Sequence, residues 1–226
     1  MTRVDDLLRE LRTHLGAAVS YTTASAANDV YEGFLFSLVV ATARRSGAVI
    51  HYEDVRGSKI RNLIFRTGPG HLYSTRRDYT HAVIEFGRAP ALEVHVGVKV
   101  QGSSGVEHEC DVLVLNAAEA VLSRRLRTSP RAGKCLIAIE CKYYTAHLPL
   151  GQARGFAGLS ADLGNAAHAI FVANIGSESV TKYLNGRKVP RELNVISGAP
   201  EIEGVQSLVR EAFKFHVGRR DSGLRI

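Results

Sequence analysis

An acid and a base stand two residues apart in the segment IECKYY, where Glu140 and Lys142 flank Cys141. In a β-strand, residues i and i+2 point to the same face, so the two charged side chains should emerge together and Cys141 should point away from them. The apolar run 136–139 comes directly before the pair and predicts a strand that belongs in a core. Burying charge without partners is costly, so the pair needs either mutual ion pairing on a solvent-facing edge or a ligand.

A second carboxylate, Asp111, opens the apolar run 112–115 in the segment HECDVLVLN. If its strand lies beside that of Glu140, the two carboxylates can converge. Together with water and a backbone carbonyl they would suit Mg²⁺, which prefers oxygen ligands. A metal there would activate a water and neutralise charge on a phosphate, while Lys142 would orient or deprotonate that water or stabilise the pentavalent phosphorus. Glu109 shares the face of Asp111 by strand alternation and is the alternative ligand.

The elements that must position these residues follow from the periodicity of the apolar side chains. Helical spacing predicts helices over about 4–15, 28–45, 150–163, 178–184 and 205–215, and Asn28 is expected to cap the second. Alternation predicts a hairpin of two strands, ALEVHVGVKVQ and HECDVLVLN, joined by a turn at GSSG. Further strands are expected at CLIAIECKYY, AHAIFVANI and LNVIS. The order αβββαβ followed by α-β-α favours an α/β fold, with a mixed central sheet flanked by helices on both faces.

The chain is expected to form a single domain over residues 1–226, with an N-terminal helix and connector over 1–27. Segment 48–88 contains short β-prone pieces separated by glycine, proline and charged residues. We interpret it as an insertion or a binding lobe. The segment and the N-terminal helix are candidates for an interface or a target-reading surface. The tail GRRDSGLRI has no apolar periodicity and is expected to be mobile.

Composition excludes several classes of protein. With 45% hydrophobic and 23% charged residues, the chain is neither disordered nor fibrous. The longest apolar stretch, 34–43, is too short to span a bilayer, and the N-terminus has no signal-peptide pattern. We therefore expect a cytoplasmic protein without a membrane partner. The three cysteines lack CxxC spacing and are expected to be buried, reduced thiols.

A net charge of +7 makes an anionic partner plausible. An arginine-rich loop, SRRLRTSPRAGK, joins the two strands that carry the candidate metal ligands. Its arginines are natural contacts for the phosphates of a nucleic acid, although they could equally be solvated surface charges. The candidate residues for nucleic-acid binding are Arg124, Arg125, Arg127 and Arg131.

Asp111 followed by the Glu140-x-Lys142 triplet, within an αβββαβ order, resembles the PD-(D/E)XK nuclease superfamily and its restriction-endonuclease-like fold. The resemblance covers about 28–175 in order of elements. It implies that Asp111 and Glu140 bind a divalent metal, with help from the backbone carbonyl of Cys141, and that Lys142 serves the nucleophile. The proline of the family name is absent, since Cys110 precedes Asp111.

The same resemblance adds two outer residues. Many members carry an acid on the helix before the hairpin, and Glu32 matches that position. Some carry a glutamine in the helix after the triplet, and Gln152 matches it. Each has a simpler alternative, since Glu32 could only complement a helix dipole and Gln152 could be an ordinary surface amide.

The resemblance implies a Mg²⁺-dependent endonuclease, for which Mn²⁺ can substitute, that hydrolyses phosphodiester bonds in DNA. The neighbouring sequence resembles restriction or Mrr-like endonucleases, which implies a prokaryotic restriction or antiviral defence setting. A homodimer is expected, because a compact nuclease with one site cuts both strands most directly as a pair. Two alternatives stay open: a junction-specific or RNA nuclease of the same fold, and a non-catalytic nucleic-acid-binding protein that retains the fold.

Overall fold

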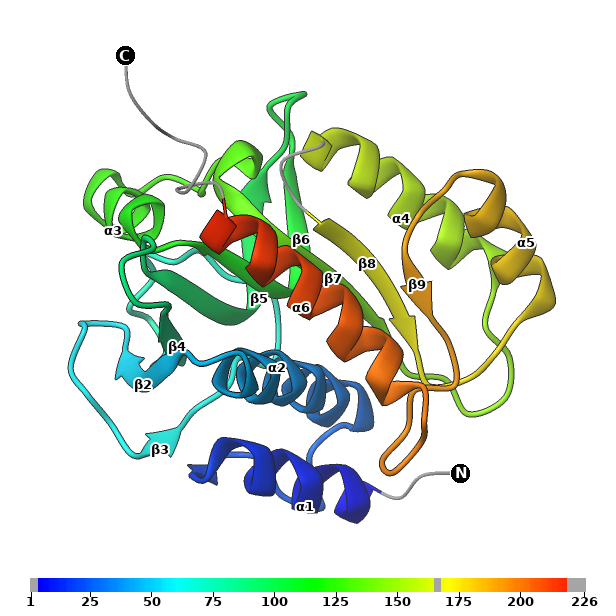
Figure 1. The fold of residues 1–226 in the computed structure, drawn as a ribbon, viewed down its shortest axis with the longest axis horizontal. Helices are drawn as coiled ribbons and strands as arrows, with labels where there is room; N and C mark the ends of the chain where they lie inside the picture. The colour runs from blue at the N-terminus through cyan, green and yellow to red at the C-terminus, as the bar shows by residue number, and fades with distance from the viewer. Residues whose placement is uncertain (1–3, 165–167, 219–226) are drawn as a thin grey trace.

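A seven-stranded mixed sheet forms the centre of the computed structural model, which describes residues 4–164 and 168–218 (Figure 1). Its strand order is β2-β4-β5-β6-β7-β8-β9. Neighbours from β2 to β7 are antiparallel, whereas β7, β8 and β9 are parallel. The strands are β2 (Val49–Asp54), β4 (Thr80–Glu85), β5 (Leu92–Gln101), β6 (Glu107–Asn116), β7 (Cys135–Lys142), β8 (His168–Ala173) and β9 (Arg191–Glu192). A small second sheet pairs β1 (Ala18–Val19) with β3 (Asn62–Leu63).

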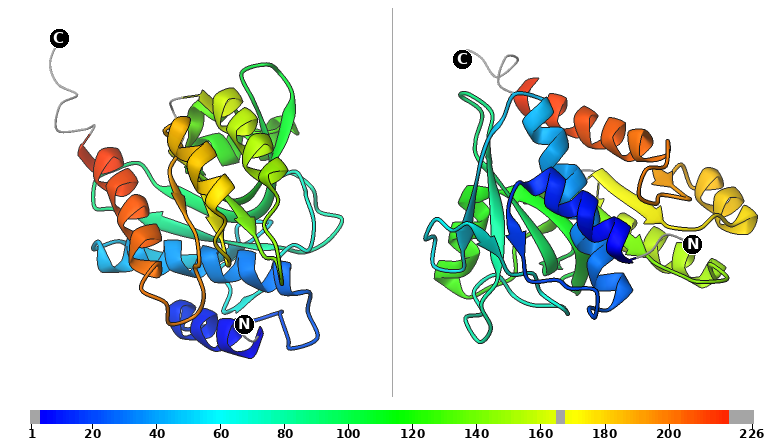
Figure 2. Two further views of the ribbon diagram at one scale, coloured as in Figure 1. Left: turned by 90° about the vertical axis from the view of Figure 1, so that its right-hand side faces the viewer. Right: turned by 90° about the horizontal axis from the view of Figure 1, so that it is seen from below.

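Helices cover both faces of the central sheet. They are α1 (Val4–Leu15), α2 (Ala27–Arg45), α3 (Ala117–Leu126), α4 (Leu150–Leu163), α5 (Glu178–Gly186) and α6 (Ile202–Gly218), with a short 3-10 turn at Ala132–Lys134. Alternate side chains of β8 divide the core: Ile170 packs with residues of α2 and α6, and Phe171 packs with residues of α4 and α5. Figure 2 shows α6 and α4 on opposite sides of the sheet. The predicted α/β class, with a mixed sheet flanked by helices, is confirmed.

Helix α2 is buried along most of its length, from Val30 to Ala43 with the exception of Glu32. One side of α2 packs on the sheet and on α6, and α1 lies against it as well (Figure 1). Helix α1 contributes the four buried leucines Leu7, Leu8, Leu11 and Leu15. The predicted cap was wrong: α2 begins at Ala27, the capping position is Ala26, and no side chain bonds to the helix terminus there.

Two further elements differ from the prediction. Helix α3 extends into the first part of the arginine-rich segment expected to be a loop, because the Asn116 side chain accepts a hydrogen bond from the Ala118 N–H and begins the helix. The prediction of a strand at LNVIS, residues 193–197, was wrong. The chain pairs with β8 at β9, just before this segment, and Asn194 then takes a left-handed φ of 62°. That conformation interrupts an extended strand. Residue 167 of the strand predicted at AHAIFVANI and residues 219–226 of the tail lie outside the described residues.

Strands from segment 48–88 extend the central sheet, since β2 and β4 form one side of it. Strand β4 pairs with β5 only at Leu92–Val94, so the remaining edge of β5 needs another partner. The chain at Gly70 supplies it: the Gly70 N–H donates to the Gly97 carbonyl at 2.9 Å, and the Lys99 N–H donates to the Gly70 carbonyl at 3.0 Å. This segment therefore lies beside the strand next to Asp111.

The tip of the β5–β6 hairpin is fixed to the end of α4 by Asp162. Its carboxylate accepts hydrogen bonds from the Ser104 hydroxyl at 2.6 Å, the Ser103 hydroxyl at 2.8 Å and the Ser104 N–H at 2.7 Å, and the His108 Nε2 lies 2.5 Å from it. These bonds hold the pKa of Asp162 well below its usual range. The hairpin that presents Asp111 is thus anchored at its far end.

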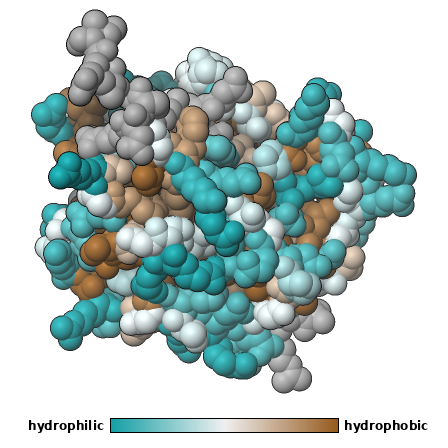
Figure 3. Space-filling view, viewed as in Figure 1, coloured by the Kyte–Doolittle hydropathy of each residue, from teal (hydrophilic) through white to brown (hydrophobic). Residues whose placement is uncertain are grey.

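Hydrophilic side chains cover much of the face in Figure 3, with hydrophobic ones between them. Exposed large apolar residues are dispersed over several elements, such as Val49 on β2, Val121 on α3 and Phe215 on α6. Within the described ranges, no helix combines the length and the apolar character needed to cross a membrane. The three cysteines are buried free thiols, as predicted.

Candidate active site

Strands β6 and β7 separate at the position of the candidate site. Their ladder ends with the pair Val112 and Ile139. Where the next pair would form, the Asp111 carboxylate instead accepts the backbone N–H of Cys141 at 2.6 Å. Strand β7 continues past this point against β8 as far as Lys142. The carboxylate of Asp111 is therefore held between the two strands, with 8% of the residue exposed.

Glu140 and Lys142 emerge together on β7, as the strand parity predicts. Lys142 Nζ lies 2.5 Å from Glu140 Oε1 and 3.9 Å from Asp111 Oδ2. Cys141 points to the other side and is buried in the core under α2. The structure thus brings Asp111, Glu140 and Lys142 into one cluster.

Glu32 joins this cluster from the second turn of α2. Burial and then the nearby charge of Asp111 raise its pKa from 4.5 to about 9. Lys142 acts in the opposite direction on the same pKa. The acid on the helix before the hairpin is therefore close enough to Asp111 and Lys142 for their charges to interact.

Asp111 and Glu109 differ in burial and in their contacts with β7. Burial and then Glu140 raise the pKa of Asp111 from 3.8 to about 7. Burial and then Glu140 also raise the pKa of Glu109, but Glu109 is an exposed residue. Asp111 makes the contacts with Cys141 and Lys142, so Glu109 lies at the outer rim of the cluster.

Gln152 is not brought into contact with the cluster. It lies half-buried in the first turn of α4, where its backbone N–H donates to the Pro149 carbonyl at 3.1 Å. Among the residues that the structure describes, no hydrogen bond or ion pair joins its side chain to Asp111, Glu140 or Lys142.

Two of the four arginines predicted as phosphate contacts are held in internal ion pairs. The two Nη atoms of Arg124 donate to Glu93 at 2.9 and 2.6 Å. Arg131 donates to Glu119 through Nε at 2.8 Å and Nη2 at 2.5 Å. Arg125 is exposed, and the Arg127 guanidinium lies 5.2 Å from the centre of the Tyr73 ring. Within the described residues, Arg125 and Arg127 are thus exposed and make no ion pair, whereas Arg131 is exposed but paired with Glu119.

A second cluster, absent from the sequence interpretation, is formed by His81, Glu93 and His95 on β4 and β5. His95 Nε2 lies 2.8 Å from Glu93 Oε2, and His81 Nε2 lies 3.5 Å from the same oxygen. One nitrogen or oxygen from each residue lies within 4.8 Å of the other two, so the group could hold a metal ion. The signal in the sequence was Glu93-x-His95 on one strand face. The third member is visible only from the β4–β5 register, which places His81 opposite His95.

Arg124 occupies the cation position of this second cluster. Burial alone would raise the pKa of Glu93. Hydrogen bonds from His95 and Arg124 outweigh burial and hold that pKa well below its usual range. Burial lowers the pKa of His81 to about 3 and also lowers that of His95, so both rings are neutral near pH 7. Glu93 is consequently a carboxylate whose charge the Arg124 guanidinium already balances. A metal ion would have to compete with that guanidinium.

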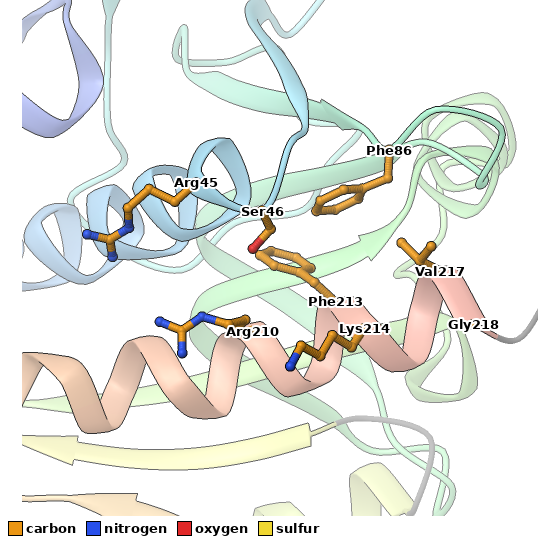
Figure 4. A pocket seen from close by; sticks show the side chains of 8 residues that line it. All are labelled: Arg45, Ser46, Phe86, Arg210, Phe213, Lys214, Val217 and Gly218. Carbon is orange, nitrogen blue, oxygen red and sulfur yellow. The ribbon is translucent and has the colours of Figure 1, made fainter.

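A hollow of about 430 Å³ lies elsewhere, between the end of α2 and α6. Figure 4 shows Phe86 and Phe213 side by side in it, with Arg45, Arg210 and Lys214 at its edges. The residues that line it include no member of either cluster. The carboxylate site is therefore separate from this apolar hollow.

Comparison with protein-family models, with curated proteins and with solved structures finds no match for this chain. The chemistry of the site follows from its own residues. Several carboxylates surround one lysine at the point where two strands separate. Such a group can bind a hard divalent cation through oxygen and hold an amine beside it.

Proposed function

We propose that this chain is a Mg²⁺-dependent endonuclease that hydrolyses phosphodiester bonds in DNA, built on the restriction-endonuclease-like αβββαβ core that its sequence resembles. The observation that supports it most is the convergence of Asp111 on β6 with Glu140 and Lys142 on β7. Two carboxylates that can hold a metal ion and a lysine beside them can together carry out metal-assisted phosphodiester hydrolysis.

The residues fit a hard divalent cation. Glu32, Asp111 and Glu140 bring three carboxylates close to Lys142, and the pKa values of Glu32 and Asp111 rise to about 9 and about 7. The pKa values rise because the carboxylates are buried and repel one another when ionised, and a bound divalent cation would relieve that repulsion. Those carboxylates and the carbonyl of Cys141 would hold Mg²⁺ or Mn²⁺. Bound there, the ion would lower the pKa of a nearby water and offset charge on the scissile phosphate.

Lys142 would act as a cation rather than as a base. Burial alone would lower the pKa of Lys142, but the negative charges of Glu140 and Asp111 outweigh burial and raise it. A protonated amine can donate hydrogen bonds to an attacking water and to the phosphate oxygens, and it stabilises the charge that develops on them. In the metal-free protein, this pKa favours roles in which Lys142 stays protonated, which are orientation of the water and stabilisation of the phosphorus, over deprotonation of the water.

Asp111 would present its carboxylate in a fixed orientation. The Cys141 N–H holds one carboxylate oxygen at 2.6 Å, which leaves the other oxygen for a ligand. A ligand group that is already positioned loses little freedom when it binds, so catalysis benefits from this bond.

The proposal extends to partners and setting. A homodimer would present two sites to the two strands of a duplex. The restriction or antiviral defence setting rests on the resemblance alone, and the cytoplasmic location stays a prediction from the sequence. The net charge of +7 is consistent with an anionic substrate.

The test is hydrolysis of supercoiled plasmid, a branched DNA junction and a structured RNA, each with Mg²⁺, Mn²⁺ or EDTA. Plasmid cleavage should require the divalent ion, and Glu140→Gln or Lys142→Ala should reduce it by at least about 10²-fold. Glu178→Gln and Lys182→Ala are matched controls, because these residues form an exposed ion pair of 2.6 Å on α5. Their variants should keep full activity.

Each substrate separates one alternative. Cleavage confined to the junction or to RNA would redirect the assignment to a structure-specific or RNA nuclease. Binding of DNA without cleavage of any substrate would support the non-catalytic alternative. Full activity in Glu140→Gln would overturn the site itself.

A further inference from the structure

The segment 64–78, called here the 64–78 loop, lies against α2, which carries Glu32, and against β5, the strand next to that of Asp111. On the α2 side, the Tyr21 hydroxyl donates to the Arg66 carbonyl at 3.0 Å. The Tyr21 ring lies against Gly33, so closely that a Cβ there would come within 2.7 Å of it. Gly33 follows Glu32 directly, and Glu32 is one of the charges that raise the pKa of Tyr21. The loop therefore reaches α2 at the position of the site.

On the sheet side, the loop meets Gly97 of β5. Gly97 lies between the register pairs Val96 with Val112 and Val98 with Cys110, which places it opposite Asp111. Its φ of +61° belongs to the left-handed region, and a Cβ there would lie 3.2 Å from the Gly68 carbonyl oxygen. The absence of a side chain thus lets the loop approach β5 closely. Two strand spacings, about 10 Å, separate the loop from Asp111.

The loop encloses a hollow of about 390 Å³ with two arginines at its rim. Arg76 and Arg77 are exposed, and within the described parts of the chain neither makes an ion pair or a side-chain hydrogen bond. Asp78 is the acid that lines the same hollow. The Arg66 guanidinium is turned inward, where it donates to the His71 carbonyl at 2.9 Å and lies 3.7 Å from the centre of the Tyr79 ring.

We propose that the 64–78 loop binds the phosphate backbone of a DNA strand beside the phosphate that is cleaved, through Arg76 and Arg77. This inference rests on the proposed nuclease function. The loop backbone at Gly70 and Asp111 are about 10 Å apart, which roughly three nucleotides cover along the helix axis, so one DNA strand at the carboxylates can also reach the loop. Arginines bind phosphate oxygens through a planar pair of donors, and they do so without reading the base sequence. The loop would therefore position the strand rather than select its sequence.

The test measures binding separately from cleavage. Fluorescence anisotropy of a labelled DNA duplex with Mg²⁺ present uses Glu140→Gln as the parent, so that the DNA stays intact. The double variant Arg76→Glu and Arg77→Glu should weaken binding about tenfold or more. The slope of log K against the logarithm of the salt concentration should become shallower by about 2, because each phosphate that the protein no longer neutralises contributes about 0.9. Lys182→Glu on α5 together with Arg187→Glu at its C-terminal cap is a control with the same change in charge.

The outcomes distinguish the loop from the enzyme. A large loss in the loop variant together with a change below about twofold in the α5 variant supports the inference. Equal losses of affinity in both variants would show that only total charge matters and would overturn the inference about the loop. In that case, plasmid cleavage by the wild type would still support the nuclease assignment. If the wild type neither binds nor cleaves DNA, the proposed function fails and the inference fails with it. Unchanged circular dichroism and melting temperature in both variants exclude misfolding as the cause.

Discussion

The carboxylate of Asp111 accepts the backbone N–H of Cys141 at 2.6 Å, in the place where the β6–β7 ladder would otherwise continue. One side chain thereby satisfies a backbone donor of β7 and keeps the two strands apart beyond that point. The structural role of Asp111 and its proposed role as a metal ligand can therefore be separated by substitution.

Asp111→Asn should keep the fold and lose the activity. The amide oxygen can still accept the Cys141 N–H, and the loss of charge relieves repulsion from Glu140, so the free energy of unfolding in EDTA should be unchanged or higher. Asp111→Ala removes the acceptor and should lower that free energy by about 1–3 kcal/mol. Urea unfolding and plasmid cleavage measure the two properties. Cleavage by Asp111→Asn at the wild-type rate would show that Asp111 is not a required ligand.

Stability without metal should fall as the pH rises above about 6.5. Burial is the largest cause that raises the pKa of Glu32 from 4.5 to about 9 and of Asp111 from 3.8 to about 7. An acid whose pKa is higher in the folded state binds its proton more tightly there, so stability is greatest below the unfolded-state pKa and declines up to the folded-state value. Below about pH 6.5 the buried neutral His81 and His95 act in the opposite direction, so in EDTA the melting temperature should decrease from about pH 6.5 to about pH 9.

Two comparisons check the origin of this pH dependence. Glu32→Gln should flatten the curve, whereas Glu178→Gln at an exposed position on α5 should leave its slope unchanged. Addition of Mg²⁺ should raise the melting temperature more at about pH 8.5 than at about pH 5.5, because a cation binds the ionised carboxylates. A larger effect of Mg²⁺ at the lower pH would contradict the prediction.

Arg124→Met should open the His81, Glu93 and His95 cluster to a metal. The variant leaves the buried Glu93 carboxylate without its cation, which should cost about 3–5 kcal/mol of stability. Zn²⁺ should restore part of the lost melting temperature, since two neutral imidazoles and a carboxylate form a ligand set that suits it. The wild type should show little response to Zn²⁺, because the guanidinium holds Glu93.

Arg131→Met is the matched control for this experiment. Arg131 also forms a two-pronged ion pair, with Glu119, but no histidine belongs to that pair. Its variant should lose less stability and gain nothing from Zn²⁺ in a thermal shift assay. A rise in the wild-type melting temperature with Zn²⁺ as large as that of Arg124→Met would show that a metal enters beside Arg124.

Gly97→Ala should loosen the 64–78 loop. The left-handed φ of +61° alone costs an alanine about 1–2 kcal/mol, and the new Cβ would also lie 3.2 Å from the Gly68 carbonyl oxygen. Gly105→Ala is a control for the backbone cost, because its φ is +86° and nothing lies within 4 Å of a Cβ there. Only Gly97→Ala should increase proteolytic cleavage inside 64–78, and equal losses of stability in both variants would argue against the contact with Gly68.

Local patterns in the sequence were sufficient for the strands that carry Asp111, Glu140 and Lys142. Alternation determines which face each side chain occupies, and the ion pair of 2.5 Å between Glu140 and Lys142 follows from that parity. Helices α1 and α4 were predicted at their observed bounds because their apolar residues recur at helical spacing and because a glycine, Gly16 or Gly164, follows each helix.

Features that depend on pairing between distant segments could not be predicted in this way. The His81, Glu93 and His95 cluster requires the β4–β5 register, which no local pattern specifies. The ion pair of Arg124 with Glu93 likewise joins α3 to β5 and turns a predicted surface arginine inward. The composition of LNVIS favours a strand, but the left-handed conformation of Asn194 prevents the segment from forming one.

The burial of α2 has a consequence for solubility. Its buried residues run almost without interruption from Val30 to Ala43, and the four leucines of α1 cover part of that apolar surface. Without α1, a helix that supports Glu32 would present hydrocarbon to water, and exposed patches of this kind drive self-association. Expression of this protein in soluble form should therefore depend on residues that take no part in its chemistry.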